Sequence, residues 1–197
     1  MKILVACEES GTVVQAFREQ NHEAFSCDLM ETRGNYPQFH IQDDVRNHLV
    51  GWDMIIGFPP CDHLAASGAR WFPEKRKDGR QQQGIDLFMA IINAPCEKIC
   101  VENPVGIMST VYRKPDQIIQ PWMFGEEAQK TTCLWLQNLP KLIPTKIVSK
   151  GAMRIYPDGT KYPLWISDAK HSKQANRSQI RGKTFAGVAN AMALQWG

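Results

Sequence analysis

The stretch that decides the fold runs Asp53-Met54-Ile55-Ile56-Gly57-Phe58-Pro59-Pro60-Cys61-Asp62-His63. The apolar run 54–58 predicts a buried strand. The two prolines end it, because proline fixes its own φ and cannot donate to a ladder. A thiol at the abrupt end of a central strand, on rigid backbone, is well placed to act as a nucleophile. The pattern fits a small buried apolar side chain after a turn equally well, so both interpretations of Cys61 stay open.

A second strand end also carries a reactive side chain. Residues 98–101 form another short apolar run, which ends on Glu102-Asn103-Pro104. In a parallel sheet with crossover helices, the carboxyl ends of the strands share one edge. We therefore expect Cys61 and Glu102 to meet in one crevice, although they are distant in sequence. A carboxylate at the end of a buried strand is rarely placed there for packing alone.

The N-terminal part has the order strand, turn, helix, strand, acid. Residues 2–7 predict a strand, Glu8-Glu9-Ser10-Gly11 a turn, 12–20 a helix and 23–27 a strand that leads to Asp28. This order is typical of half a nucleotide-binding fold, in which the acid accepts from a ribose hydroxyl. The paired glutamates would repel a pyrophosphate, so a ligand with a ribose and no phosphates fits better. Alternatively, Gly11 is a turn glycine and Asp28 a solvated strand end.

The remaining elements are predicted less sharply. Residues 39–41 predict a third strand, and Asp44 then either caps a helix that begins at Val45 or faces a ligand. Residues 131–136 predict a strand, and 85–93 and 184–196 predict helices. Residues 106–120 are polar and irregular, and 149–161 show no clear period.

Length and composition indicate one ordinary globular domain over residues 1–197. The formal charge of +3 permits a nucleic acid partner without requiring one. The chain begins with a strand rather than a signal peptide, and no apolar run is long enough to span a membrane. The six cysteines are scattered, so we expect buried thiols rather than a disulfide framework, in a cytoplasmic protein.

Two basic segments are candidates for contact with a substrate. Residues 64–80 read as a mobile loop in which Arg70 and several lysines stand beside Trp71 and Phe72, a composition that suits phosphates and stacked bases. Residues 170–183 include Arg177 and Arg181 and contain no acidic residue. Either segment could equally be a solvated charged surface.

With these motifs assembled, the chain resembles the cytosine-5 DNA methyltransferase family, in particular its short phage-type members. Pro59-Pro60-Cys61 is similar to the family's Pro-Cys nucleophile motif, and Glu102-Asn103-Pro104 to its Glu-Asn-Val motif. Ser10-Gly11 looks like the end of its cofactor turn. Asp28 sits where its ribose-binding acid falls, and Asp44-Val45 where an acid and an apolar residue meet adenine.

The resemblance implies an α/β fold with a doubly wound, mostly parallel sheet of the Rossmann-like methyltransferase type. It implies S-adenosylmethionine as cofactor, held by Ser10, Gly11, Asp28, Asp44, Val45 and Pro60. The reaction would be methyl transfer to carbon 5 of cytosine in DNA. Cys61 would add to carbon 6, Glu102 would stabilise the activated base, and Asn103 would aim Glu102. Arg70, Arg177 and Arg181 would contact the substrate.

The chain also departs from the family pattern. Glu9 replaces an aromatic residue, the Gln-x-Arg-x-Arg motif is absent in that form, and there is no room for a separate target recognition domain. These departures keep two alternatives open. One is carbon-5 modification of a free pyrimidine nucleotide or of RNA. The other is a non-catalytic phage-type binding or counter-defence protein on the same scaffold. A protein partner or a homodimer would fit the small size.

A metal site is not expected from the cysteine and histidine spacing. Neither Cys61-x-His63 nor Cys96-x-x-x-Cys100 matches the usual zinc pattern.

Overall fold

The structure is a computed structural model that describes residues 1–171, 182 and 184–197. Its centre is one seven-stranded sheet with strand order β3-β2-β1-β4-β5-β7-β6. β7 is antiparallel to both of its neighbours, whereas β3, β2, β1, β4 and β5 run parallel to one another. The strands are β1 (Lys2–Ala6), β2 (Glu23–Asp28), β3 (His40–Gln42), β4 (Met54–Gly57), β5 (Lys98–Asn103), β6 (Gln117–Ile119) and β7 (Thr132–Gln137). The predicted α/β fold with a mostly parallel sheet is confirmed.

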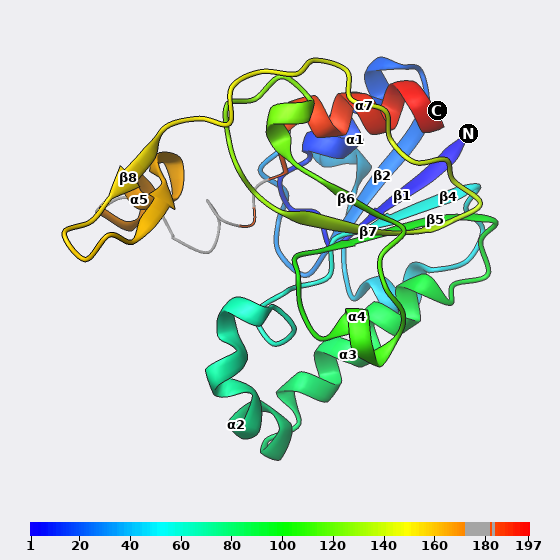
Figure 1. The fold of residues 1–197 in the computed structure, drawn as a ribbon. Coiled ribbons are helices and arrows are strands. Elements are labelled where there is room, and N and C mark those ends of the chain that lie inside the picture. The colour runs from blue at the N-terminus through cyan, green and yellow to red at the C-terminus, as the bar shows by residue number, and fades with distance from the viewer. Residues whose placement is uncertain (172–181, 183) are drawn as a thin grey trace.

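Helices cover both faces of the sheet (Figure 1). On one face lie α1 (Thr12–Glu19) and α7 (Ala186–Trp196), which pack against each other; on the other lie α3 (Arg80–Ile92) and the short α4 (Met108–Val111). Strand alternation divides the core accordingly. Ile3 and Val5 of β1 pack with the α1 and α7 side chains, whereas Leu4 packs on the α3 side. Both faces of the parallel strands are therefore buried, which explains their continuous apolar sequences.

Several expectations from the sequence are corrected. Residues 64–80 are largely helical rather than a mobile loop: they hold the 3-10 helix η3 (Ala66–Trp71) and helix α2 (Phe72–Lys77). Pro73 in the first turn of α2 favours helix initiation, and Phe72 is buried beneath it. The irregular segment 106–120 contains α4 and β6.

Residues 149–161, in which the sequence shows no clear period, also contain regular structure. A two-stranded ribbon of β8 (Met153–Ile155) and β9 (Lys161–Pro163) leads into α5 (Leu164–His171). The turn is Pro157-Asp158-Gly159, with Gly159 at φ 80°, a conformation that glycine adopts without strain. We call residues 153–171 the ribbon module and residues 66–77 the α2 arm.

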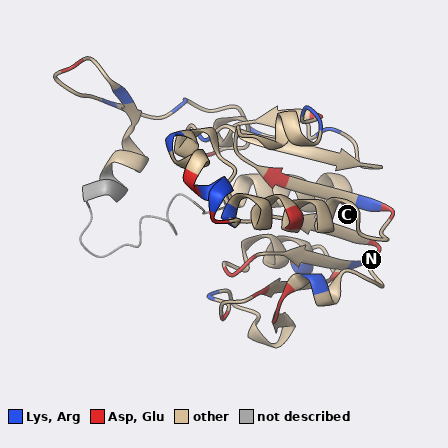
Figure 2. Ribbon diagram, turned by 90° about the horizontal axis from the view of Figure 1, so that it is seen from below, with Lys and Arg blue, Asp and Glu red and all other residues tan. Residues whose placement is uncertain are grey.

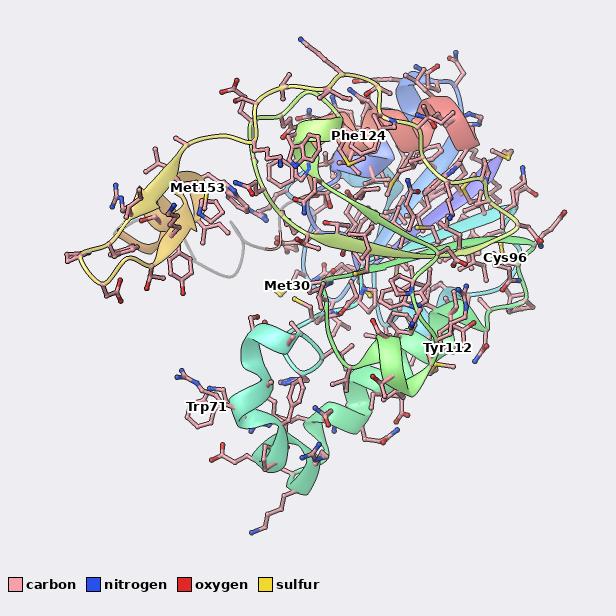
Figure 3. All side chains as sticks on the ribbon, in the orientation of Figure 1. Met30, Trp71, Cys96, Tyr112, Phe124 and Met153 are labelled. Atoms are coloured by element: carbon pink, nitrogen blue, oxygen red, sulfur yellow. The ribbon has the colours of Figure 1, made fainter. Side chains whose placement is uncertain are left out.

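Both extensions project on the side of the sheet where the parallel strands end, opposite the N-terminus (Figure 1). In Figure 3, Met153 marks the ribbon module, Trp71 the α2 arm, and Met30, just after β2, lies between them, whereas Cys96 lies at the opposite edge. The carboxyl edge of the sheet is thus flanked by two projections. The remaining 3-10 helices are η1 (Pro37–Phe39), η2 (Val45–His48) and η4 (Pro121–Met123).

None of the six cysteines forms a disulfide, as predicted; four of them are buried, whereas Cys7 and Cys61 are half-buried. Within residues 1–171 and 184–197, we find no helix with the length and apolar character that crossing a membrane requires.

Candidate active site

The ends of β4 and β5 lie side by side. Their register pairs Gly57 with Val101, so the turn that carries Cys61 follows directly beside the end of β5. The sequence predicted that Cys61 and Glu102 share one crevice, but Cys61 is not among the residues that line the Glu102 cavity. Asn103 is 1% exposed, and its side-chain Nδ2 donates a 2.8 Å hydrogen bond to the carbonyl of Pro59. The end of β5 therefore holds the turn that presents Cys61.

The segments that follow β4 and β5 remain hydrogen-bonded to each other beyond the ends of these strands. The amide of Ala66 donates to the carbonyl of Val105 (2.9 Å), and the amide of Ile107 donates to the carbonyl of Leu64 (3.0 Å). A Cβ atom on Gly106 would lie 2.2 Å from the Leu64 oxygen, so only glycine permits this approach. Cys61 and Glu102 thus belong to one rigid unit rather than to two independent loops.

The α2 arm and α3 support the Cys61 turn from the other side. Lys75 donates to the carbonyl of Asp62, and Gln81, which is 4% exposed, donates to the carbonyl of His63 (3.2 Å). His63 Nδ1 is buried and has no hydrogen-bond partner among the described residues.

Glu102 faces a small cavity on the α7 side of the sheet. The cavity measures about 20 Å³, which is room for a water molecule or an exocyclic group but not for a whole pyrimidine ring. Burial raises the pKa of Glu102, and the charge of Lys130 and a hydrogen bond between the Glu102 and Thr132 side chains partly oppose that rise. The lining residues are Phe58, Glu102, Ile119, Pro121, Lys130, Thr132, Thr184, Phe185, Val188 and Met192.

Lys130 and Thr132 were not singled out from the sequence. Leu134 pairs with Glu102 across the β5–β7 ladder, so alternate residues of β7 and of the segment before it lie on the Glu102 face. The alternation of side chains along the predicted strand could have identified Lys130 and Thr132. This inference requires knowing that β7 lies antiparallel beside β5.

The turn after β1 is closed by its own carboxylate. Glu8, 4% exposed, accepts hydrogen bonds from the amides of Val13 (2.7 Å) and Val14 (3.2 Å) and from the Ser10 hydroxyl (3.1 Å). The start of α1, where a pyrophosphate would bind, is therefore filled by a side chain of this protein. Burial raises the pKa of Glu8.

The loop after β2 packs on this turn. Gly11 has φ 67°, and a Cβ atom there would lie 2.8 Å from the Cα of Gly34. Arg33 forms an ion pair with Glu9 (2.6 Å), and the Thr32 hydroxyl donates to the Glu9 carbonyl (3.1 Å). Ser10 is consequently half-buried and Gly11 is buried by the chain itself.

Asp28 and Asp44 end neighbouring strands at the same edge. Asp28 accepts from the amide of Met30 (2.9 Å), and its carbonyl accepts from the amide of Asp43 (3.1 Å).

Burial, and then the charge of Asp28, raise the pKa of Cys7 to about 12. The thiol of Cys7 is therefore a poor nucleophile.

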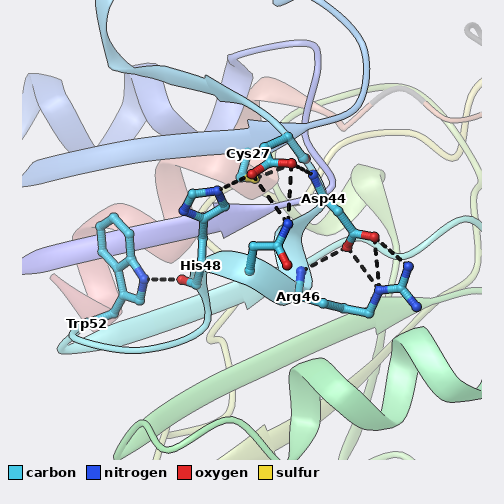
Figure 4. A network of polar contacts seen from close by, with 7 residues as sticks. Cys27, Asp44, Arg46, His48 and Trp52 are labelled. Carbon is cyan, nitrogen blue, oxygen red and sulfur yellow. Dashed lines mark hydrogen bonds and ion pairs between the residues drawn. The ribbon is translucent and has the colours of Figure 1, made fainter.

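Asp44 caps η2, which confirms the capping alternative: its carboxylate accepts from the amide of Arg46 (3.0 Å) and pairs with the Arg46 guanidinium (Figure 4). These hydrogen bonds lower the pKa of Asp44 to about 2. Val45 is 5% exposed and contributes to the core.

The predicted substrate-contacting arginines are only partly placed. Arg70 is exposed on η3, and its guanidinium lies 5.0 Å from the ring of Trp71. Arg177 and Arg181 lie outside the described residues. In the described part of the chain, no group of three or more His, Cys, Asp or Glu side chains is gathered as a metal site requires.

The sheet order, with a single antiparallel strand among parallel ones, and the helices on both faces define an α/β protein that resembles a methyltransferase structure. One similar solved structure is an E. coli prophage protein described as a candidate DNA modification methyltransferase, with a TM-score of 0.51 and 15% sequence identity. The match covers 76% of this chain and 52% of that protein, so the chain spans about half its length. No protein-family model and no curated protein sequence matches the chain.

Proposed function

We propose that the chain is an S-adenosylmethionine-dependent methyltransferase that modifies carbon 5 of cytosine in DNA. The observation that carries this proposal is the rigid joint between the Cys61 turn and the Glu102 strand end, made by the Asn103–Pro59 hydrogen bond. A thiol nucleophile and a proton-bearing carboxyl on one scaffold are what addition to a pyrimidine ring requires.

The residues at the β1–β3 edge suit the cofactor. Glu8 fills the start of α1, so the site favours an adenosine ligand without phosphates. Asp28 would accept from the ribose hydroxyls, and Val45 would contact adenine. Asp44, although paired with Arg46, would offer its remaining lone pairs to the adenine amine. Ser10, Gly11 and Pro60 would line the remainder. When bound, S-adenosylmethionine supplies an electrophilic methyl group.

The chemical work of the chain falls to Cys61 and Glu102. The Cys61 thiol first loses its proton to solvent, and the thiolate then forms a bond to carbon 6 of cytosine while Glu102 donates its proton to ring N3, so that no full negative charge builds up on the ring. Lys130 and Thr132 then stabilise the ionised Glu102. After carbon 5 is methylated, a base removes the carbon 5 proton. The sulfur–carbon bond breaks, and the N3 proton returns to Glu102.

The raised pKa of Glu102 supports this assignment, because it keeps the carboxyl protonated closer to neutral pH than an ordinary glutamate. A base in duplex DNA must leave the stack to reach the site. Because the Glu102 cavity is too small for a whole ring, its lining would have to move to admit the base.

The decisive experiment is transfer of labelled methyl from S-adenosylmethionine to duplex DNA, single-stranded DNA, RNA and dCMP. We expect wild type to label duplex DNA, Cys61→Ala to label nothing, and the control Cys96→Ala, at the opposite edge (Figure 3), to match wild type. Labelling of RNA or dCMP alone would move the substrate to the alternative class. Label that persists in Cys61→Ala would refute the mechanism. No label from wild type on any substrate would favour the non-catalytic interpretation.

A further inference from the structure

The positive charge of the chain is concentrated in one stretch. Residues 149–183 contain eight Lys or Arg and two Asp, a formal charge of +6, whereas the whole chain carries +3. The rest of the molecule is therefore at −3. Such asymmetry within one domain indicates a surface that meets a polyanion. The described part of this stretch is the ribbon module.

The ribbon module has a small core of its own. The rings of Tyr156 and Tyr162 meet edge to face at 6.0 Å, and the Tyr156 hydroxyl is 3.0 Å from the hydroxyl of Ser167, which is 2% exposed. The amide of Leu164 donates to the carbonyl of Ala152 (2.8 Å) and closes the base of the ribbon. The ribbon is thus a formed element, backed on one face by α5.

Its other face is open. The register pairs Met153 with Pro163 and Ile155 with Lys161, so these four side chains share one face. Ile155 is 64% exposed, Met153 is 39% exposed, and Lys161 is exposed. Lys161 is the basic residue of this face, because Arg154 pairs with Tyr162 on the face that α5 covers. Between Met153 and Pro163 the acidic residue is Asp158, which lies in the turn (Figure 2). An apolar and cationic face on a projecting ribbon is suited to a groove lined by phosphates.

We propose that this outer face of the ribbon docks in the major groove of duplex DNA. The proposal rests on the proposed function and names the surface through which the substrate is held. The major groove admits a two-stranded ribbon. Lys161 would contact phosphate, and Ile155 would contact apolar groups at the floor of the groove, such as a thymine methyl.

Two contacts fix the ribbon module beside the Glu102 cavity. Trp165 of α5 stacks edge to face on Phe185 at 5.4 Å, and Phe185 lines that cavity. At the root of the ribbon, the Gln129 side chain donates to the Met153 sulfur (3.1 Å), one residue before Lys130. A duplex held on the ribbon would therefore lie along the edge that presents Cys61, with the α2 arm on its other side (Figure 1).

The test compares two matched double variants by fluorescence anisotropy of a labelled DNA duplex. Ile155→Ser with Lys161→Ser removes the ribbon face. Ile143→Ser with Lys141→Ser removes an exposed pair of the same two residue types on the body, where Ile143 is 71% exposed. We expect the ribbon variant to bind about tenfold more weakly and to lose about one unit of salt slope, because it removes one phosphate contact. The body variant should bind as wild type does. Lys161→Glu provides a second ribbon variant that keeps Ile155.

The outcomes separate this proposal from the proposed function. Unchanged duplex affinity in both ribbon variants, with methyl transfer intact, would overturn the docking surface and leave the function standing. Loss of duplex affinity in a protein that transfers no methyl group would support the docking surface alone. An equal loss on single-stranded DNA or RNA would overturn docking in the major groove.

Discussion

Glu8, which is buried, and Glu102, which is half-buried, are two carboxyls at the same edge of one sheet, and they are held in opposite ways. Burial raises the pKa of both. Glu8 accepts three hydrogen bonds from residues within six positions of it in the chain. Glu102 instead faces a cavity, and the groups that moderate its charge, Lys130 and Thr132, come from a different part of the sheet.

The difference separates a structural acid, Glu8, from the acid that we propose to be reactive, Glu102. The capacity of Glu8 to accept hydrogen bonds is used to close the start of α1, which stabilises the turn and leaves little for a ligand. Glu102 lines a cavity, so its carboxyl, whose pKa is raised by burial, is open to a substrate. A buried acid whose partners all lie nearby in sequence is thus best interpreted as a cap.

The largest effect is expected from a substitution of Glu102. We expect Glu102→Gln to lower the rate of methyl transfer by about 10²- to 10³-fold, as the loss of one stabilising group in a buried site typically does. The substitution keeps the shape of the side chain, so the far-ultraviolet circular dichroism should not change. Single-turnover kinetics with excess enzyme measures the effect on the chemical step. A rate within a few-fold of wild type would show that Glu102 is no more reactive than Glu8.

Glu8→Ala tests the structural role of Glu8 at the start of α1. Removal of the carboxylate leaves buried amides at the start of α1 without an acceptor, which should lower the free energy of unfolding by about 1–3 kcal/mol. Urea denaturation followed by tryptophan fluorescence measures this change. The rate per folded molecule should stay within a few-fold of wild type. The control is Glu19→Ala, at the exposed end of the same helix, which should be nearly neutral. Equal losses in the two variants would remove the capping role.

The sequence predicted the elements whose signal is local. The apolar runs of β1, β4 and β5 and the helical spacing of α1 identified them, and adjacent parallel strands brought the Cys61 turn and the end of β5 together. β6, β8 and β9 were missed; each has three residues, too few for a period to show, although the equally short β3 was predicted at 39–41. The turn Pro157-Asp158-Gly159 was a usable signal for the ribbon.

The contacts that complete the candidate site were beyond the reach of sequence patterns. The partner of Asn103 is the Pro59 carbonyl, a backbone atom 44 positions away that no side-chain motif marks. Lys130 and Thr132 reach Glu102 because β7 inserts antiparallel between β5 and β6. Local periodicity defines a strand but not the strand beside it. Side chains that meet across a ladder therefore require the topology.

The smallest expected effect concerns pH. A carboxyl with a raised pKa binds its proton more tightly in the folded protein than in the unfolded chain. The stability that it contributes is therefore full below the ordinary pKa of 4.5 and is lost as pH rises through the folded value. Each of the two carboxyls adds a slope of at most about 1.4 kcal/mol per pH unit in that window.

Asp44 acts in the opposite sense and at lower pH. Its pKa is lowered from 3.8 to about 2, so its contribution is lost only as pH falls below that ordinary value. The two effects separate above pH 4.5, where Asp44 is ionised in both the folded and the unfolded states. Urea denaturation at a series of pH values should show Glu102→Gln gaining stability relative to wild type as pH rises above 4.5. Glu8→Gln should gain less with rising pH, because three hydrogen bonds stabilise the charged form of Glu8 and oppose the rise of its pKa. If the two variants gained equally, the two carboxyls would be equivalent.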